Sequence, residues 1–198
     1  MATSRTIGVS IPVPEPYGSL LQRCRAGFGD PAAHAIPSHV TLLPPTDVTS
    51  AVLPPLVRHL AAVARAGRAF PLRLAGTGTF RPRSPVVFVT LVEGGPECAE
   101  LQEAVRSGPV PRPLDFPYHP HVTVAHGIPA EALDRAQREL ADFAADWTVT
   151  GFSLYERGAD EVWHPLREFP FGRPSGTRPA VPQQPGVPHA EGVPQARP

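Results

Sequence analysis

PSHVTLL, at residues 37–43, and HPHVTVA, at residues 119–125, share the tripeptide His-Val-Thr. The two histidines, His39 and His121, lie 82 residues apart in a chain of 198 residues. Apolar spacing and Gly/Pro breaks predict the same order of elements around both copies: strand, turn, helix, loop, His-Val-Thr strand, helix and strand. The sequence therefore indicates an internal repeat. Coincidence is the alternative, since three-residue matches of common residues occur by chance.

The elements predicted around the two motifs alternate between apolar strands and amphipathic helices. Besides the motif strands, strands are expected at residues 6–11, 70–74, 86–92, 147–154 and 161–169. Helices are expected at residues 19–28, 52–66, 99–108 and 129–144. The second of these helices is expected to begin late, because Pro54 and Pro55 fit only a first helical turn. Two copies of one unit imply two lobes related by a pseudo-two-fold axis, with the motifs facing each other across a cleft.

The folded part is expected to be one domain of residues 1–172, with lobes at about 5–80 and 86–171. A length of 198 residues and a hydrophobic content of 41% are enough for such a core. Residues 173–198 contain seven prolines and no Phe, Tyr, Trp, Ile or Leu. Such a segment cannot bury a core, so we expect a disordered Pro-rich tail.

Charge balance, cysteine content and the N-terminal region indicate which binding partners and which cellular location to expect. The 18 basic and 18 acidic residues balance, so no global field favours DNA, long RNA or a membrane surface. Every basic residue is arginine, which excludes Schiff-base and P-loop lysine chemistry. Cys24 and Cys98 are too few for a disulfide framework or a cysteine zinc site, and prolines interrupt the N-terminal region before a signal sequence or membrane span. We therefore expect a cytoplasmic protein without a membrane or DNA partner.

Each His-Val-Thr strand presents an imidazole and a hydroxyl on the same face. Side chains alternate along a strand, so His39 shares a face with Thr41, and His121 with Thr123. Two histidines across a cleft can supply one general base and one general acid near neutral pH. Two threonine hydroxyls can donate to the non-bridging oxygens of a phosphate held between them. This pattern favours in-line chemistry at phosphorus, and it requires neither a metal nor a cofactor.

The paired motifs, in duplicated α/β units, resemble those of the 2H phosphoesterase superfamily, which includes 2′-5′ RNA ligase-like proteins and cyclic nucleotide phosphodiesterases. The resemblance covers residues 5–171. It implies an α+β, bilobal fold with two antiparallel sheets flanked by helices and a central cleft. It also implies that the catalytic residues are His39, Thr41, His121 and Thr123.

The resemblance further implies a reaction that opens or forms an RNA 2′,3′-cyclic phosphate or a 2′-5′ phosphodiester. By analogy, His121 would activate water and His39 would protonate the leaving O3′, giving a 2′-phosphate, although a pseudo-symmetric site can run in either direction. Ligation would use the same chemistry in reverse, with a ribose 5′-hydroxyl attacking the cyclic phosphate. The balanced charge favours a small cyclic nucleotide or a short RNA end as the substrate.

Six further residues are candidates for substrate binding: Phe80, Arg81, Arg83, Tyr118, His119 and His126. The two arginines could reach a phosphate, and Phe80 and Tyr118 could stack on a base. Many members of the family carry a basic residue where this chain has the segment 125–127, so His126 could replace one phosphate contact. A solvated turn for the arginines and core positions for the aromatic rings are the alternatives.

Two other classes of function stay open. The chain could be a nucleotide- or RNA-binding module that kept the cleft but not turnover. It could also be a metal hydrolase that uses the string His119, His121 and His126, although no nearby carboxylate has ligand spacing. Loss of activity on replacing either motif histidine distinguishes catalysis from binding, and sensitivity to chelators distinguishes the metal hydrolase.

Overall fold

The computed structural model describes residues 4–114 and 116–172, which form eight strands, four α-helices and one short 3₁₀ helix. The strands are β1 (Ser4–Pro12), β2 (His39–Thr49), β3 (Phe70–Thr79), β4 (Val86–Glu93), β5 (His121–His126), β6 (Ala144–Val149), β7 (Gly151–Arg157) and β8 (Trp163–Pro170). The helices are α1 (Tyr17–Gly27), η1 (Pro31–His34), α2 (Leu53–Ala66), α3 (Gly95–Arg106) and α4 (Ala130–Glu139). The predicted tail at 173–198 lies outside the described residues. Within the described residues, no helix is both long and apolar enough to cross a membrane.

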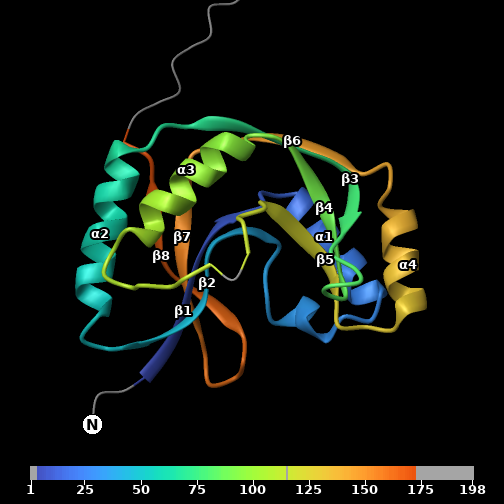
Figure 1. Cartoon of the computed structure of the whole chain (residues 1–198), viewed down its shortest axis with the longest axis horizontal. Helices are drawn as coiled ribbons and strands as arrows, with labels where there is room; N and C mark the ends of the chain where they lie inside the picture. Colours follow the sequence, from blue (N-terminus) through green and yellow to red (C-terminus); the bar gives the residue numbers. More distant parts are fainter. Residues whose placement is uncertain (1–3, 115, 173–198) are drawn as a thin grey trace, which may run out of the picture.

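All eight strands form one antiparallel sheet, in the order β6-β3-β4-β5-β2-β1-β7-β8. The expectation of two separate sheets is therefore wrong, because β2 and β5 join at the centre, where Val40 pairs with Val122. Strands from the two sequence halves are also interleaved, since β3 pairs with β4 and β6, whereas β7 pairs with β1. The sheet is curled and the helices lie around it (Figure 1).

Side-chain periodicity explains how the helices cover this sheet. In α2, the buried residues Leu56, Leu60 and Ala64 recur every four positions and form one apolar stripe. Helix α2 packs against α3 and β8, α3 packs against β2, and α1 packs against β5. The valines of the two motifs, Val40 and Val122, are fully buried in the core. The central strands are thus fixed by apolar contacts from one side of each motif.

Several predicted boundaries differ from the observed ones: the helix expected at 129–144 ends at Glu139, and the one expected at 99–108 begins at Gly95. Two further differences have identifiable reasons. Helix α2 begins at Leu53 rather than late, because its prolines occupy the first turn, where a missing N–H breaks no helical hydrogen bond. The single strand expected at 147–154 is divided into β6 and β7, which lie near opposite ends of the sheet. Its apolar pattern continues across the break, so the pattern alone does not show that the chain changes position in the sheet.

Candidate active site

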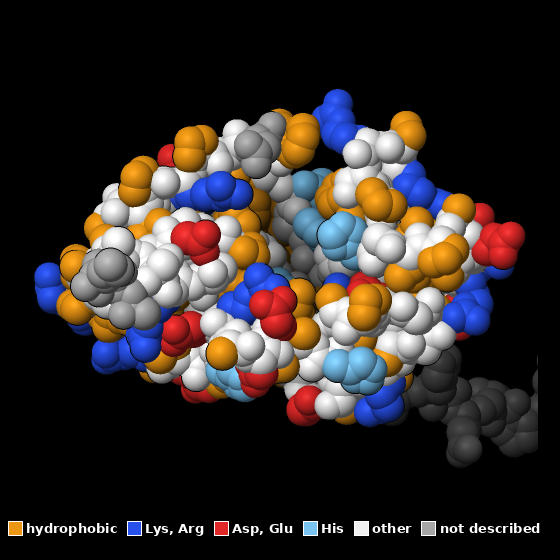
Figure 2. Space-filling view, turned by 90° about the horizontal axis from the view of Figure 1, so that it is seen from below, with side chains coloured by type: hydrophobic (Ala, Val, Ile, Leu, Met, Phe, Trp, Pro, Cys, Tyr) orange, Lys and Arg blue, Asp and Glu red, His pale blue; other side chains and the backbone are white. Residues whose placement is uncertain are grey.

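Two adjoining cavities contain the motif side chains, and Thr41 borders both of them. The small cavity, of about 200 Å³, is lined by His39, Thr41 and Thr123 among others. The large cavity, of about 930 Å³, is lined by Thr41 and His121. Each residue predicted for the site borders at least one of the two cavities. Figure 2 shows a hollow in the surface with histidine side chains gathered beside it.

The register of the two central strands brings the motif side chains together. Because Val40 pairs with Val122 across antiparallel strands, each motif histidine falls opposite the threonine of the other motif. The valines are buried and the motif His and Thr are partly accessible, which confirms the predicted alternation. The two histidines are diagonal neighbours on adjoining strands rather than opposed across a cleft between lobes. The backbones of diagonal positions lie roughly 7–8 Å apart, a spacing that suits one phosphoryl group between the two side chains.

A β-bulge follows the threonine of each motif. Between Thr41 and Leu43, strand β2 has one extra residue relative to β1. Between Thr123 and Ala125, strand β5 has one extra residue relative to β4. A bulge changes which side chains face each side of a sheet. This shift explains why His126 lines the small cavity, on the face from which strict alternation would exclude it.

Both motif histidines are held through the same ring nitrogen. His39 Nδ1 lies 2.6 Å from the carbonyl oxygen of Pro37, and His121 Nδ1 lies 2.7 Å from the carbonyl oxygen of His119. A carbonyl oxygen can only accept, so Nδ1 carries the hydrogen in each ring. The other nitrogen, Nε2, then has a lone pair in the neutral ring and an N–H in the protonated ring. Each imidazole can therefore act as base or acid through Nε2.

Burial lowers the pKa of both motif histidines below the ordinary value of 6.5. The carbonyl contacts at Nδ1 oppose this shift, because they favour the protonated ring. Nearby positive charge adds to it: Arg25 lowers the pKa of His39, and the rings of His119 and His39 lower that of His121. Without an anion in the site, the neutral form of each ring is favoured near neutral pH.

The hydroxyls of Thr41 and Thr123 are available to a ligand, since neither forms a hydrogen bond with another described residue. The backbone beside them is held in place, because the Tyr118 hydroxyl donates to the carbonyl oxygen of Thr41 at 2.9 Å. Burial raises the pKa of Tyr118, so this hydroxyl stays a neutral donor. Tyr118 also borders the large cavity. Stacking of its ring on a base stays a prediction.

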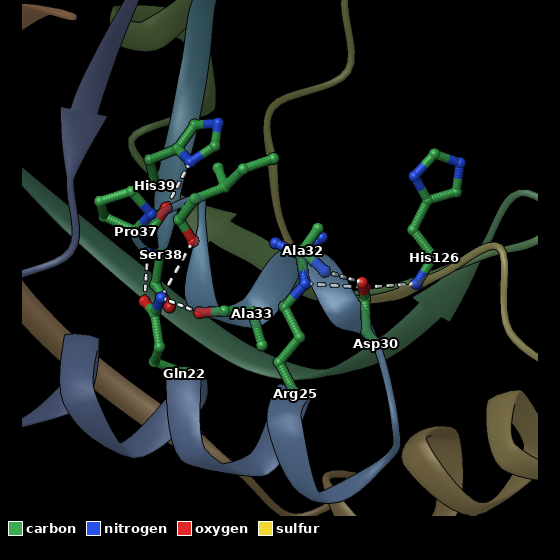
Figure 3. A network of polar contacts seen from close by, with 10 residues as sticks. Gln22, Arg25, Asp30, Ala32, Ala33, Pro37, Ser38, His39 and His126 are labelled. Carbon is green, nitrogen blue, oxygen red and sulfur yellow. Dashed lines mark hydrogen bonds and ion pairs between the residues drawn. The ribbon is translucent and has the colours of Figure 1, made fainter. Parts of the chain in front are cut away.

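Arg25, in α1, is a site residue that sequence reasoning missed. It is only 5% exposed, and it lines the small cavity. Figure 3 shows it between His39 and His126. Its Nε donates to Asp30 Oδ2 at 2.7 Å, and Asp30 also accepts from the backbone N–H groups of Ala32 and His126. The lining of this cavity contains one arginine and no Asp or Glu among the described residues, so the cavity is suited to an anion.

The two predicted arginines of the large cavity differ in how they are engaged. Arg81 donates to Asp134 at 2.7 Å and to Gln137 at 3.0 Å, and it therefore anchors its loop to α4. The Arg83 guanidinium carbon lies 5.2 Å from the ring centre of Phe116. Arg83 has no ion pair within the described part of the chain. Of the two, Arg83 is the one with a free charge.

Phe80 packs against protein rings at the edge of the large cavity. Its ring centre lies 5.0 Å from that of His121 and 5.5 Å from that of His119, both edge to face. A third ring, Phe88, lies 4.5 Å away. These contacts hold the His121 ring in place from the side of the large cavity. Stacking of Phe80 on a base stays a prediction.

The histidine string considered as a metal site is divided by the fold. His126 lines the small cavity, whereas His119 and His121 line the large one. Across residues 4–114 and 116–172, no three His, Cys, Asp or Glu side chains are grouped as metal ligands. The string therefore does not form a ready ligand set in the described part of the chain.

Comparison with known proteins identifies relatives of this chain in sequence and in fold. A Bacillus thuringiensis (strain Al Hakam) protein named "Putative phosphoesterase" is 27% identical over 146 residues, which are 73% of this chain and 84% of that protein. Escherichia coli LigT in apo form has a similar fold, with a TM-score of 0.62 and 22% identity over 86% of this chain and 99% of LigT. TT0787 of Thermus thermophilus has a TM-score of 0.59 and 23% identity over 85% of this chain and 98% of TT0787. The sequence model of the 2′-5′ RNA ligase superfamily matches residues 12–161, and the chain therefore belongs to this superfamily of 2H phosphoesterases.

Proposed function

We propose that the protein hydrolyses 2′,3′-cyclic phosphates of nucleotides or RNA ends to 2′-phosphates. The observation that carries this proposal is the pair of imidazoles with free Nε2 atoms, placed diagonally on adjoining strands beside two unpaired threonine hydroxyls. General acid–base catalysis at phosphorus needs this set of groups around one phosphate. Membership of a phosphoesterase superfamily supports an enzymatic function.

In the proposed reaction, Nε2 of His121 takes a proton from water, and the water oxygen forms a bond to phosphorus. The bond between phosphorus and O3′ breaks, and Nε2–H of His39 gives its proton to O3′. The product is a 2′-phosphate with a free 3′-hydroxyl, so atoms and protons balance. The Thr41 and Thr123 hydroxyls donate to the non-bridging oxygens. In the ligation variant, a ribose 5′-hydroxyl replaces water and forms a 2′-5′ linkage.

Arg25 supplies guanidinium N–H donors in this proposal, held in place by its ion pair with Asp30. Its Nε is occupied by Asp30, which leaves the terminal nitrogens for a phosphate oxygen in the small cavity. Arginine suits this role because its planar fork matches two phosphate oxygens. Charge that develops on the phosphoryl group would then be stabilised by a group already in place.

The large cavity is the proposed place for the nucleoside. Its volume of about 930 Å³ and its lining by Tyr118 and Arg83 support this assignment. Crystal structures of E. coli LigT include complexes with 3′-AMP and with ATP, and nucleotides are accordingly the first ligands to test. We also propose the cytoplasm as the location, which the free thiols of Cys24 and Cys98 support.

The proposed activity is tested by incubating the full chain with the four nucleoside 2′,3′-cyclic monophosphates and a short RNA that ends in a cyclic phosphate, in excess EDTA. Products are separated by chromatography against 2′- and 3′-nucleotide standards. Turnover to the 2′-phosphate that survives chelation supports the proposal. Binding without turnover by the folded protein would overturn it in favour of a nucleotide-binding module, and turnover abolished by EDTA would favour a metal hydrolase.

The pH dependence of kcat/KM is expected to be bell-shaped, with its alkaline limb centred below 6.5. The reaction requires one motif histidine neutral and the other protonated, and the pKa of each is lowered below 6.5 by burial. As the pH rises through the higher of these two pKa values, the acid loses its proton and the rate falls. Measuring kcat/KM from pH 4 to pH 8 at constant ionic strength, with circular dichroism at each pH, checks this. An alkaline limb above pH 7.5 would contradict the assignment.

Replacing Arg83 by alanine is expected to weaken the action on RNA ends more than that on cyclic mononucleotides. Its free charge lies beside the large cavity, where a longer strand would place a second phosphate. One lost phosphate contact on a single strand reduces the slope of log(kcat/KM) against log salt by roughly 0.7. Arg81→Ala is the matched control, because Asp134 already neutralises Arg81. Equal slopes for wild type and Arg83→Ala would disprove the contact.

A further inference from the structure

Gln102 occupies a core position of α3 with a polar side chain. The buried residues of this helix are Cys98, Leu101, Gln102 and Val105, and their spacing is that of a helix face turned to the core. Gln102 is 5% exposed. An apolar side chain of similar size would satisfy the packing of such a position. The amide of Gln102 is therefore not explained by the fold.

The amide of Gln102 has no hydrogen-bond partner in residues 4–114 and 116–172. Native proteins pair the large majority of buried polar side-chain atoms, so an unpaired amide needs an explanation. Neither of its polar atoms is among those fully sealed from solvent, and the open space that Gln102 borders is the large cavity. A group that enters this cavity can supply the missing hydrogen bonds.

The surroundings of Gln102 select a flat, aromatic ligand. The large cavity also presents the rings of Tyr118 and Phe116, and Phe116 is 59% exposed. Aromatic faces of this kind stack on unpaired bases. A carboxamide offers one acceptor and two donor hydrogens, which complement a base edge that carries a donor beside an acceptor. A nucleobase has a flat face that can stack on the aromatic rings and a polar edge that can hydrogen-bond the Gln102 amide.

We propose that Gln102 hydrogen-bonds the edge of a nucleobase held in the large cavity and thereby sets the base preference of the enzyme. This inference rests on the proposed function and adds to it a residue that reads the base. Thr41 borders both cavities, so a nucleoside seated beside Gln102 can present its phosphate between His39 and His121. The amide thus acts on the choice of substrate rather than on the chemical step.

The test compares kcat/KM for the four nucleoside 2′,3′-cyclic monophosphates in wild type, Gln102→Leu and Gln102→Glu. The wild type is expected to prefer one or two bases by about 10-fold or more, the range that one bidentate contact supplies. Gln102→Leu should reduce this preference to about 2-fold. Gln102→Glu should shift it toward bases with an exocyclic amino group, because an ionised carboxylate only accepts. Glu103→Ala, one position further along α3 and exposed, is the control.

Two further measurements separate a structural role from base recognition. A base-free ribose 2′,3′-cyclic phosphate should be hydrolysed equally by wild type and Gln102→Leu, and the Tm of Gln102→Leu should be unchanged or higher. Calorimetric titration with the four nucleoside monophosphates tests the same contact if no protein shows turnover, so failure of the proposed function is distinguishable. An unchanged base ranking in Gln102→Leu, or a wild type that does not discriminate among bases, overturns the inference.

Discussion

Replacing either His39 or His121 by alanine is expected to lower kcat/KM for cyclic phosphate hydrolysis by roughly 100- to 10,000-fold, the range that one general acid or base contributes. Each ring has a single free nitrogen, because Nδ1 is committed to a backbone carbonyl oxygen. The nearest other histidines lie outside the His-x-Thr positions: His119 precedes β5, and His126 is its last residue. The acid and the base act in one step, so the double variant should be little worse than either single variant.

The matched control for this experiment is His34→Ala. His34 is exposed at the end of η1 and borders neither cavity. Its activity should equal that of the wild type, and all variants should show the same circular dichroism spectrum. If His39→Ala or His121→Ala kept more than a tenth of the wild-type activity with the same pH profile, the two-histidine mechanism would be wrong.

The orientation of the motif side chains could be predicted, because buried apolar residues alternate with accessible polar residues in both motifs. Val40 and Val122 are buried, and their neighbours in each motif are not, so the shared face of His and Thr follows from strand geometry alone. The order of strands and helices follows in the same way from apolar spacing, except that β6 and β7 are expected as one strand. These features depend only on residues close together in the chain.

The joining of the sheet could not be predicted, because it depends on which strand edges meet. The apolar pattern of β2 and β5 is satisfied whether they pair with each other or end two separate sheets, and their single pairing at Val40 decides it. The bulges after Thr41 and Thr123 are also properties of a strand pair rather than of one strand. The bulge after Thr123 brings His126 to the small cavity, whereas strict alternation along the strand places it on the other face.

Arg25 and Gln102 are both polar residues on the apolar face of a helix, a pattern that the sequence shows but that has two interpretations. Gly18, Leu21 and Arg25 form the buried stripe of α1, and Gln102 falls among buried apolar residues of α3. A polar residue on an apolar stripe either pairs inside the protein or faces a site. Only the tertiary structure distinguishes these cases, by placing Asp30 beside Arg25 and the large cavity beside Gln102.

Replacing Arg25 by methionine is expected to lower kcat/KM by roughly 100- to 1,000-fold, the cost of removing one preorganised group that stabilises charge in a transition state. It should also weaken inhibition by inorganic phosphate. The alkaline limb of the pH profile should move to higher pH if His39 is the acid, because Arg25 lowers the pKa of that histidine. Arg23→Met, two positions earlier on the same helix and exposed, should show none of these effects.

The Arg25 variant must be separated from simple loss of stability, because breaking a buried pair costs about 3–5 kcal/mol through the charge left behind. Both partners are almost fully buried, so Asp30 would be that charge. The double variant Arg25→Met/Asp30→Asn removes it and keeps one oxygen, which can accept from the N–H group of either Ala32 or His126, whereas the two oxygens of Asp30 accept from one each. It should therefore recover most of the lost Tm while activity and phosphate inhibition stay low. Recovery of activity together with Tm would show that the pair only braces α1 against β5, and the anion site would have to be sought elsewhere.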